Sequence, residues 1–203
     1  MSTSELAATP APAPAPSFGL FAGQVWGILF LGLLFGSGAW RLTAKAFEII
    51  REHPLLTTMD YLVYGGIFLL GAAKAEFLFR RALVYRTLAR ARHALVTPLD
   101  WLLAPFCMLS FYRPWQRKHQ ILSWIVVPVM VGLAVYFAVG DIHPTLKGSV
   151  DLAIGLALGY AALWYALALV RLVGWRLMGA PPERHPLPAW RGPVPGTEPT
   201  AGA

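Results

Sequence analysis

Residues 18–40 read FGLFAGQVWGILFLGLLFGSGAW and carry no charged side chain over 23 consecutive positions. At a rise of about 1.5 Å per residue, a helix of this length crosses a hydrocarbon core of about 30 Å. A helix that is apolar on every side needs lipid or deep protein around it. This stretch therefore predicts a transmembrane helix.

Three further apolar runs follow, and they predict spans at about 60–79, 121–140 and 151–173. The composition agrees, because only 13% of the residues are charged, about half of the roughly 25% found in soluble domains. Asp60 and Asp151 open two of these runs, where a carboxylate favours the N-terminal end of the helix dipole, so we expect both to cap helices. The sequence predicts an all-α membrane protein with four transmembrane helices.

Both ends of the chain are rich in proline, which favours extended and disordered structure. Residues 1–17 carry an Ala-Pro repeat and lack the basic start of a cleavable signal peptide. Residues 180–203 contain seven prolines. We predict one four-helix transmembrane domain at 18–179 between two disordered Pro-rich tails.

A further apolar piece at 94–112 reads ALVTPLDWLLAPFCMLSFY and is interrupted by Pro98, Asp100 and Pro105. Proline breaks a helix, and an ionised Asp is costly at the centre of a bilayer. We therefore predict an interfacial or re-entrant segment rather than a fifth span. It belongs to a basic interfacial segment at 80–120.

Basic residues divide unequally between the two sides that four spans create, with 11 on one side and four on the other. The positive-inside rule then places both termini and the segment 80–120 in the cytoplasm. Abundant Arg, Ala and Pro favour a GC-rich bacterial genome, so we predict the bacterial inner (plasma) membrane. The net charge of +7 is explained by cytoplasmic loops, and no nucleic-acid partner is expected.

Small residues recur along the first and fourth predicted spans. Helices in lipid associate through close backbone approach at such residues. In the first span two glycine pairs lie on opposite faces, and in the fourth the small residues form one stripe. We predict helix packing at Gly23, Gly27, Gly32, Gly36, Gly155, Gly159, Ala162 and Ala166. One stripe serving self-association or a partner subunit is the alternative.

Three charged residues near the end of the second span form a candidate intramembrane polar site: Lys74, Glu76 and Arg80. Glu76 and Arg80 are four residues apart and can form an ion pair. Lys74 can extend to the cytoplasmic headgroups. Ionisable residues in a membrane are candidates for function, so a lipid-headgroup, proton or substrate site is the alternative to a structural role.

The cytoplasmic segment mixes basic and aromatic residues, which attract anionic lipid headgroups when they lie beside a membrane. The alternative is a docking platform for a cytoplasmic partner or an acidic substrate. The candidate docking residues are Arg81, Arg86, Arg90, Arg92, Arg113, Trp115, Arg117 and Lys118.

Catalytic and metal-binding patterns are missing from the sequence. No histidine lies inside a predicted span, which argues against a haem in the bundle core. The one cysteine, Cys107, permits neither an internal disulfide nor an all-cysteine metal site, and we expect it to be a buried, inert thiol. There is no H-E-x-x-H, G-x-S-x-G or P-loop motif. We expect no catalytic, cofactor-binding or metal-binding residues.

Three classes of function stay open. The first is a non-catalytic subunit, or an assembly or scaffold factor, of a larger membrane complex, with anionic lipids and other membrane subunits or a second copy as partners. The second is a small oligomeric transporter or channel. The third is a lipid- or quinone-active enzyme at the cytoplasmic face, using Asp100, His93, His119 or Glu76.

Overall fold

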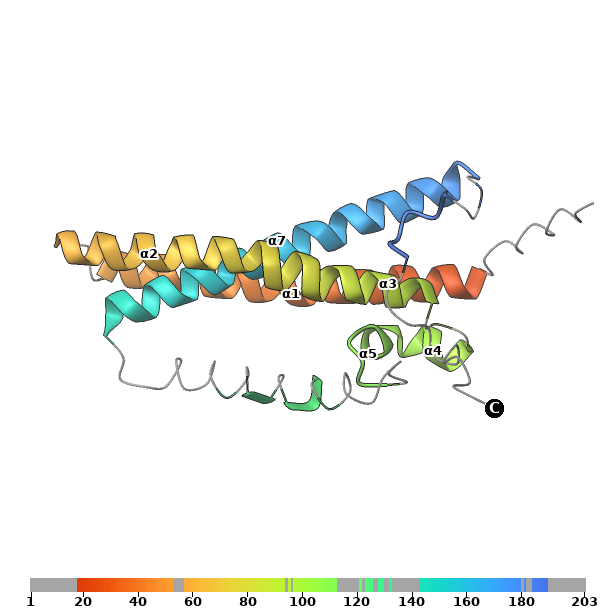
Figure 1. Ribbon diagram of the computed structural model, residues 1–203, viewed down its shortest axis with the longest axis horizontal. Helices are drawn as coiled ribbons and strands as arrows, with labels where there is room; N and C mark the ends of the chain where they lie inside the picture. The colour runs from red at the N-terminus through yellow and green to blue at the C-terminus, as the bar shows by residue number, and fades with distance from the viewer. Residues whose placement is uncertain are drawn as a thin grey trace, which may run out of the picture.

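In the computed structural model, three long helices run side by side and form an elongated bundle (Figure 1). Helix α1 spans Phe18–Glu52. Helix α2 (Thr58–Lys74) continues through a π-helical segment, η1 (Ala75–Val84), into α3 (Tyr85–His93). Helix α7 spans Pro144–Leu177. The structure describes residues 18–52, 57–93, 95, 97–112, 121, 123–125, 128–129, 132, 143–179, 181 and 184–189.

The predicted all-α class is confirmed, since the described residues form helices and no strand. Two helices, α1 and α7, are long and apolar enough to cross a membrane. Only 28% of the apolar window of each is buried inside the protein, whereas the core helix of a soluble protein is mostly buried. Helix α2 has 17 residues and extends directly into η1. The predicted span at 121–140 falls largely outside the described residues.

Helix α1 is longer than predicted, because residues 41–52, expected to begin a loop, continue the helix. This stretch contains no Gly or Pro and is rich in Arg, Lys, Ala and Glu, which are good helix formers. Helix α2 then opens with a capping box, in which Asp60 Oδ2 accepts a hydrogen bond from the Thr57 N–H at 3.1 Å. The capping role predicted for Asp60 is confirmed. The same prediction for Asp151 is wrong, because α7 begins about two turns earlier.

The apolar piece at 94–112 forms two five-residue helices, α4 (Pro98–Leu102) and α5 (Ala104–Met108). A capping box between Thr97 and Asp100 starts α4, and the Asp100 carboxylate accepts from the Thr97 N–H at 2.7 Å. Neither helix is long enough to cross a bilayer. Both lie against the N-terminal half of α1, where the Trp26 indole N–H donates to the Leu102 carbonyl at 3.2 Å.

Glycines on α1 allow close contacts on two sides. A methyl group at Gly23 would lie 2.8 Å from Trp101 Cβ, and one at Gly27 would lie 3.1 Å from Ala104 Cβ, so these glycines face α4 and α5. Gly32 and Gly36 instead face α7. Backbone contact at the first pair explains how the short helices sit so near α1.

The small residues of α7 face α1 over part of the predicted stripe. A methyl group at Gly155 would lie 2.6 Å from Thr43 Oγ1 and 3.1 Å from the Thr43 nitrogen. Gly159 and Ala162 also lie beside α1. Ala166, the last member of the predicted stripe, is exposed.

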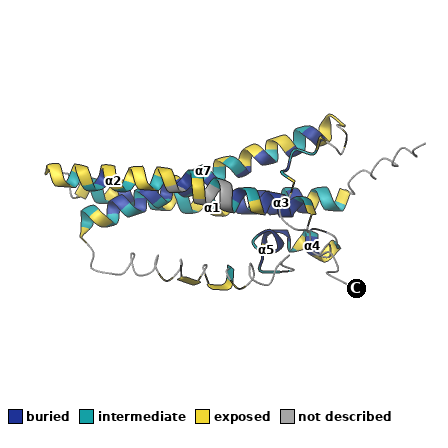
Figure 2. Ribbon diagram, viewed as in Figure 1, coloured by how far each residue is buried: buried dark blue, intermediate teal, exposed yellow. Residues whose placement is uncertain are grey.

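Burial is concentrated where α1, α3, α5 and α7 meet, while α2 is largely exposed (Figure 2). Tyr165 of α7 is fully buried there and stacks on Phe35 at a centroid distance of 5.7 Å. Leu187 joins the same core with 1% exposure. Leu187 thus anchors residues 184–189, part of the predicted disordered C-terminal tail, to the bundle. The N-terminal tail and residues 190–203 lie outside the described residues.

Candidate functional site

The predicted ion pair on the second helix is present, with Arg80 Nη2 2.6 Å from Glu76 Oε1. Both residues lie on η1, and π-helical segments occur often at functional sites. The other carboxylate oxygen of Glu76 accepts a hydrogen bond from the Tyr160 hydroxyl at 2.6 Å. The carboxylate thus links η1 to α7. The side chain of Lys74, the third predicted member, lies outside the described part of the structure.

Aromatic side chains of α7 complete the site. The Arg80 guanidinium lies over the Trp164 ring at 5.0 Å from its centroid, a distance that allows a cation–π interaction. Trp164 contacts Tyr160 edge to face, with centroids 6.2 Å apart. We call Glu76, Arg80, Tyr160 and Trp164 the polar cluster. Glu76 and Arg80 neutralise each other, and both are about one-third exposed.

Two cavities flank the polar cluster on the surface between the second helix and α7. The first has a volume of about 310 Å³ and is lined by Arg80, Tyr85, Trp164 and Arg171, with two prolines of the C-terminal segment. Arg171 is exposed and has no ion pair or hydrogen bond within the described part of the chain.

The second cavity has a volume of about 350 Å³ and lies towards the middle of α2. Its walls are mainly apolar and include Phe68, Ala72 and Leu156. Glu76 and Tyr160 form its polar end. The polar cluster therefore separates a cationic cavity from an apolar one.

The C-terminal segment, residues 184–189, forms one wall of the cationic cavity and is fastened by hydrogen bonds to α3. The Tyr85 hydroxyl donates to the Ala189 carbonyl at 2.8 Å, and the Arg92 guanidinium donates to the Leu187 carbonyl at 3.2 Å. His185 lies against the Trp175 ring with centroids 4.7 Å apart.

Burial lowers the pKa of His185 to about 4, and the positive charges of Arg92 and His93 add to this effect. The docked segment therefore holds a neutral imidazole at neutral pH. The His185 Nδ1 accepts a hydrogen bond from the Leu187 N–H at 3.2 Å, which a protonated nitrogen would not do.

The predicted basic docking platform is only partly a surface. Arg86 is exposed, but Arg90 is 4% exposed and Arg92 is half-buried. Burial, with the neighbouring charge of Arg86, lowers the pKa of Arg90 to about 10. Arg90 is therefore not available for docking, because it lies on the face of α3 that is buried inside the protein. The Arg81 side chain and Arg113, Trp115, Arg117 and Lys118 lie outside the described residues.

Buried polar contacts that join α3 to α1 and α7 were not predicted. The Gln24 side-chain amide donates to the Ala91 carbonyl at 3.0 Å. The hydroxyls of Thr87 and Tyr165 lie 2.7 Å apart and share a hydrogen bond. These pairs satisfy polar groups in an apolar interior and so help to fix which helix faces meet.

The residues considered for catalysis do not assemble into a catalytic set within the described structure. Asp100 is fully buried and serves the α4 capping box. Cys107 is buried, as predicted, and its thiol donates to the Asp100 carbonyl at 3.8 Å. No group of three or more His, Cys, Asp or Glu side chains is placed to hold a metal among the described residues. His119 lies outside them.

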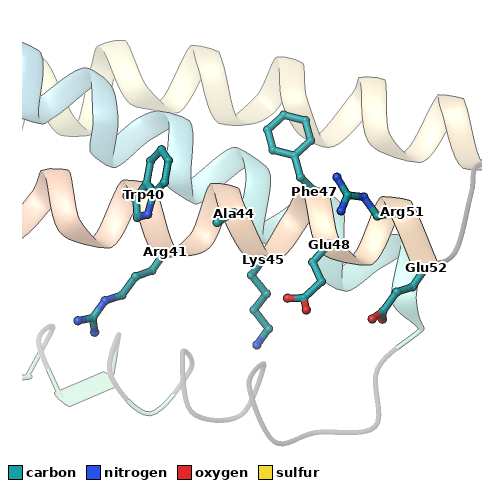
Figure 3. A pocket seen from close by; sticks show the side chains of 8 residues that line it. All are labelled: Trp40, Arg41, Ala44, Lys45, Phe47, Glu48, Arg51 and Glu52. Carbon is teal, nitrogen blue, oxygen red and sulfur yellow. The ribbon is translucent and has the colours of Figure 1, made fainter.

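A third cavity, of about 760 Å³, lies along the C-terminal turns of α1 (Figure 3). Arg41, Lys45, Glu48 and Glu52 project from one side of this helix. The described lining residues all belong to α1 and include three basic and two acidic side chains. This arrangement is typical of a solvated helix face.

Tyr160 and Trp164 of α7 were not predicted from the sequence as members of this site. Their spacing of four residues could have indicated the site, because it places both rings on one face of α7. Buried Tyr and Trp side chains usually form a hydrogen bond through their O–H or N–H group. Comparison with known protein families, curated proteins and solved structures finds no match to this chain.

Proposed function

We propose that the protein is a non-catalytic, multi-spanning membrane protein that serves as a subunit or assembly scaffold of a larger membrane complex. The observation that supports this most directly is the exposure of α2. Of the α2 side chains that the structure describes, only that of Tyr64 is buried. Leu62, Leu69 and Leu70 are each more than 60% exposed.

The same helix offers a place for close helix contact. Gly65 and Gly66 open into free space, and a side chain added at either would meet nothing within 4 Å. Helices in a membrane approach most closely at such residues. We therefore assign the outward face of α2, which includes Leu62, Gly66 and Leu69, to contact with a helix of a partner subunit.

The membrane placement follows from the exposed apolar surface and from charge. The apolar windows of α1 and α7 face mostly outward, and a continuous helix of 36 residues joins α2 to α3. We place these helices across a bacterial inner membrane, with both termini in the cytoplasm. Residues 121–140 then supply the remaining span of the four. Reporter fusions at each terminus test this orientation.

Quantitative mass spectrometry of proteins that co-purify with the tagged chain tests the proposed function. The variant Gly66→Leu should lose partners that the wild type retains at near-equal stoichiometry. The matched control is Gly174→Leu, because Gly174 also opens into free space but lies on α7. A wild-type preparation without stoichiometric partners, or full partner retention in Gly66→Leu, would contradict the proposal.

A further inference from the structure

We propose that the cationic cavity between α3 and α7 binds the phosphate of an anionic phospholipid, and that an acyl chain of this lipid extends past the polar cluster into the apolar cavity. This inference rests on the membrane placement given above, but not on any partner subunit.

The charges of the cationic cavity favour a bound anion. Arg80 and Arg171 both line it, and Glu76 is the carboxylate that contacts Arg80. That carboxylate is already held by Arg80 and by the Tyr160 hydroxyl. Arg171 therefore offers its guanidinium to a ligand, and the planar fork of guanidinium donors matches the oxygens of a phosphate.

The walls of the cavity come from the divergence of two helices. Figure 1 shows α7 spreading away from α3 towards its C-terminal end, with the C-terminal segment crossing the gap. Pro186 and Pro188 line the cavity on that side, and the hydrogen bond from Tyr85 to Ala189 ties the segment to α3. The cavity, of about 310 Å³, is large enough for a phosphate and its neighbouring headgroup atoms.

The apolar cavity favours a phospholipid over a free anion. Leu156 lines it and Arg171 lines the cationic cavity, and both lie on α7. Fifteen residues of helix separate them, or about 22 Å, which is close to the depth of one leaflet with its headgroups. Inorganic phosphate would use only the cationic end, whereas a phospholipid uses both.

The proposed orientation of the chain in the membrane supports an anionic phospholipid as the ligand. Arg171 lies near the C-terminal end of α7, which we place at the cytoplasmic side, and anionic lipids enrich the cytoplasmic leaflet. Leu163 and Val170, which directly precede the cavity-lining residues Trp164 and Arg171 on α7, are 55% and 69% exposed. The site therefore opens towards lipid.

Native mass spectrometry of the purified full chain, incubated in mixed micelles with equal amounts of phosphatidylglycerol and phosphatidylcholine, tests the inference. The wild type should retain phosphatidylglycerol preferentially. Arg171→Gln should lower that preference about tenfold, the size expected for a lost charge-assisted contact. Arg86→Gln is the matched control, because Arg86 is exposed on α3 and does not line the cavity.

A second variant separates a phospholipid from a free anion. Ala157→Phe fills the apolar cavity and leaves both arginines in place, so it should reduce lipid retention and leave any binding of inorganic phosphate unchanged. Equal lipid preference in Arg171→Gln and Arg86→Gln would overturn the inference. So would full lipid retention in Ala157→Phe, or displacement of the lipid by inorganic phosphate. Failure to find partner proteins leaves this result unaffected, so the two proposals fail separately.

Discussion

Replacing Leu187 by Ala tests whether the C-terminal segment is a folded part of the bundle. Leu187 is 1% exposed and lies in the main core, so truncation should cost about 2–5 kcal/mol. The hydrogen bonds from Tyr85 and Arg92 to the segment add about 0.5–1.5 kcal/mol each.

Ordering the segment opposes these contributions. Fixing one residue costs about 1–2 kcal/mol, and Pro186 and Pro188 reduce that cost because their backbones are already restricted. A loss of about 3 kcal/mol at Leu187 shifts the docking equilibrium roughly 100-fold, since about 1.4 kcal/mol corresponds to tenfold.

Hydrogen–deuterium exchange of a peptide that covers residues 184–189 measures this equilibrium. Exchange should be slow in the wild type and about 100-fold faster in Leu187→Ala. Leu187→Met, which conserves volume, should cost less than about 1.5 kcal/mol and retain most of the protection. The reasoning is refuted if Leu187→Ala exchanges at the wild-type rate, or if the wild-type segment already exchanges at the rate of an unfolded peptide.

Three further perturbations test other parts of the structure. Docking of the C-terminal segment should depend on pH, because His185 has a pKa of about 4 when docked and an ordinary pKa of about 6.5 when released. The released state binds more protons between these two pKa values, so docking is strongest above about pH 6.5 and weakens as the pH falls towards about 4. Hydrogen exchange of the segment, divided by the intrinsic exchange rate at each pH, measures this change. Protection that does not depend on pH would contradict the prediction. Gly155→Val should lower the stability of the bundle by about 1–3 kcal/mol, because the valine side chain would collide with α1. The control variant Gly174→Val should have little effect. Equal melting temperatures for the two variants would contradict the close contact between α7 and α1. Tyr160→Phe should destabilise the bundle by about 1 kcal/mol through loss of its hydrogen bond to the Glu76 carboxylate, which is about one-third exposed. An unchanged melting temperature would show that this contact is energetically neutral.

The features that sequence reasoning predicted well are local along the chain. Glu76 and Arg80 pair because they are four residues apart, and the capping contact of Asp60 joins residues three apart. Boundaries were less predictable. The loop expected after residue 40 is helical to Glu52, since the charges there ended the apolar pattern but not the helix.

Contacts between distant residues could not be predicted, because they depend on which helix faces meet. Tyr160 is 84 residues from Glu76, and Leu187 is 95 residues from Arg92, the residue that binds its carbonyl. A proline-rich composition favours an extended segment, but composition does not show whether a groove is present to receive it. Arg90 illustrates the same limit, since only the packing of α3 against its neighbours buries it.

The sequence by itself determined that this chain is helical and that two of its helices are apolar enough to cross a membrane, because hydropathy and helix propensity act over a few residues. Only the packing of the helices brings the ion pair on η1 to two aromatic rings of α7, and places Arg80, Arg171 and two prolines of the C-terminal segment around one cavity. The physical reason is that packing selects one arrangement of helix faces, and the position and charge of each cavity follow from that arrangement.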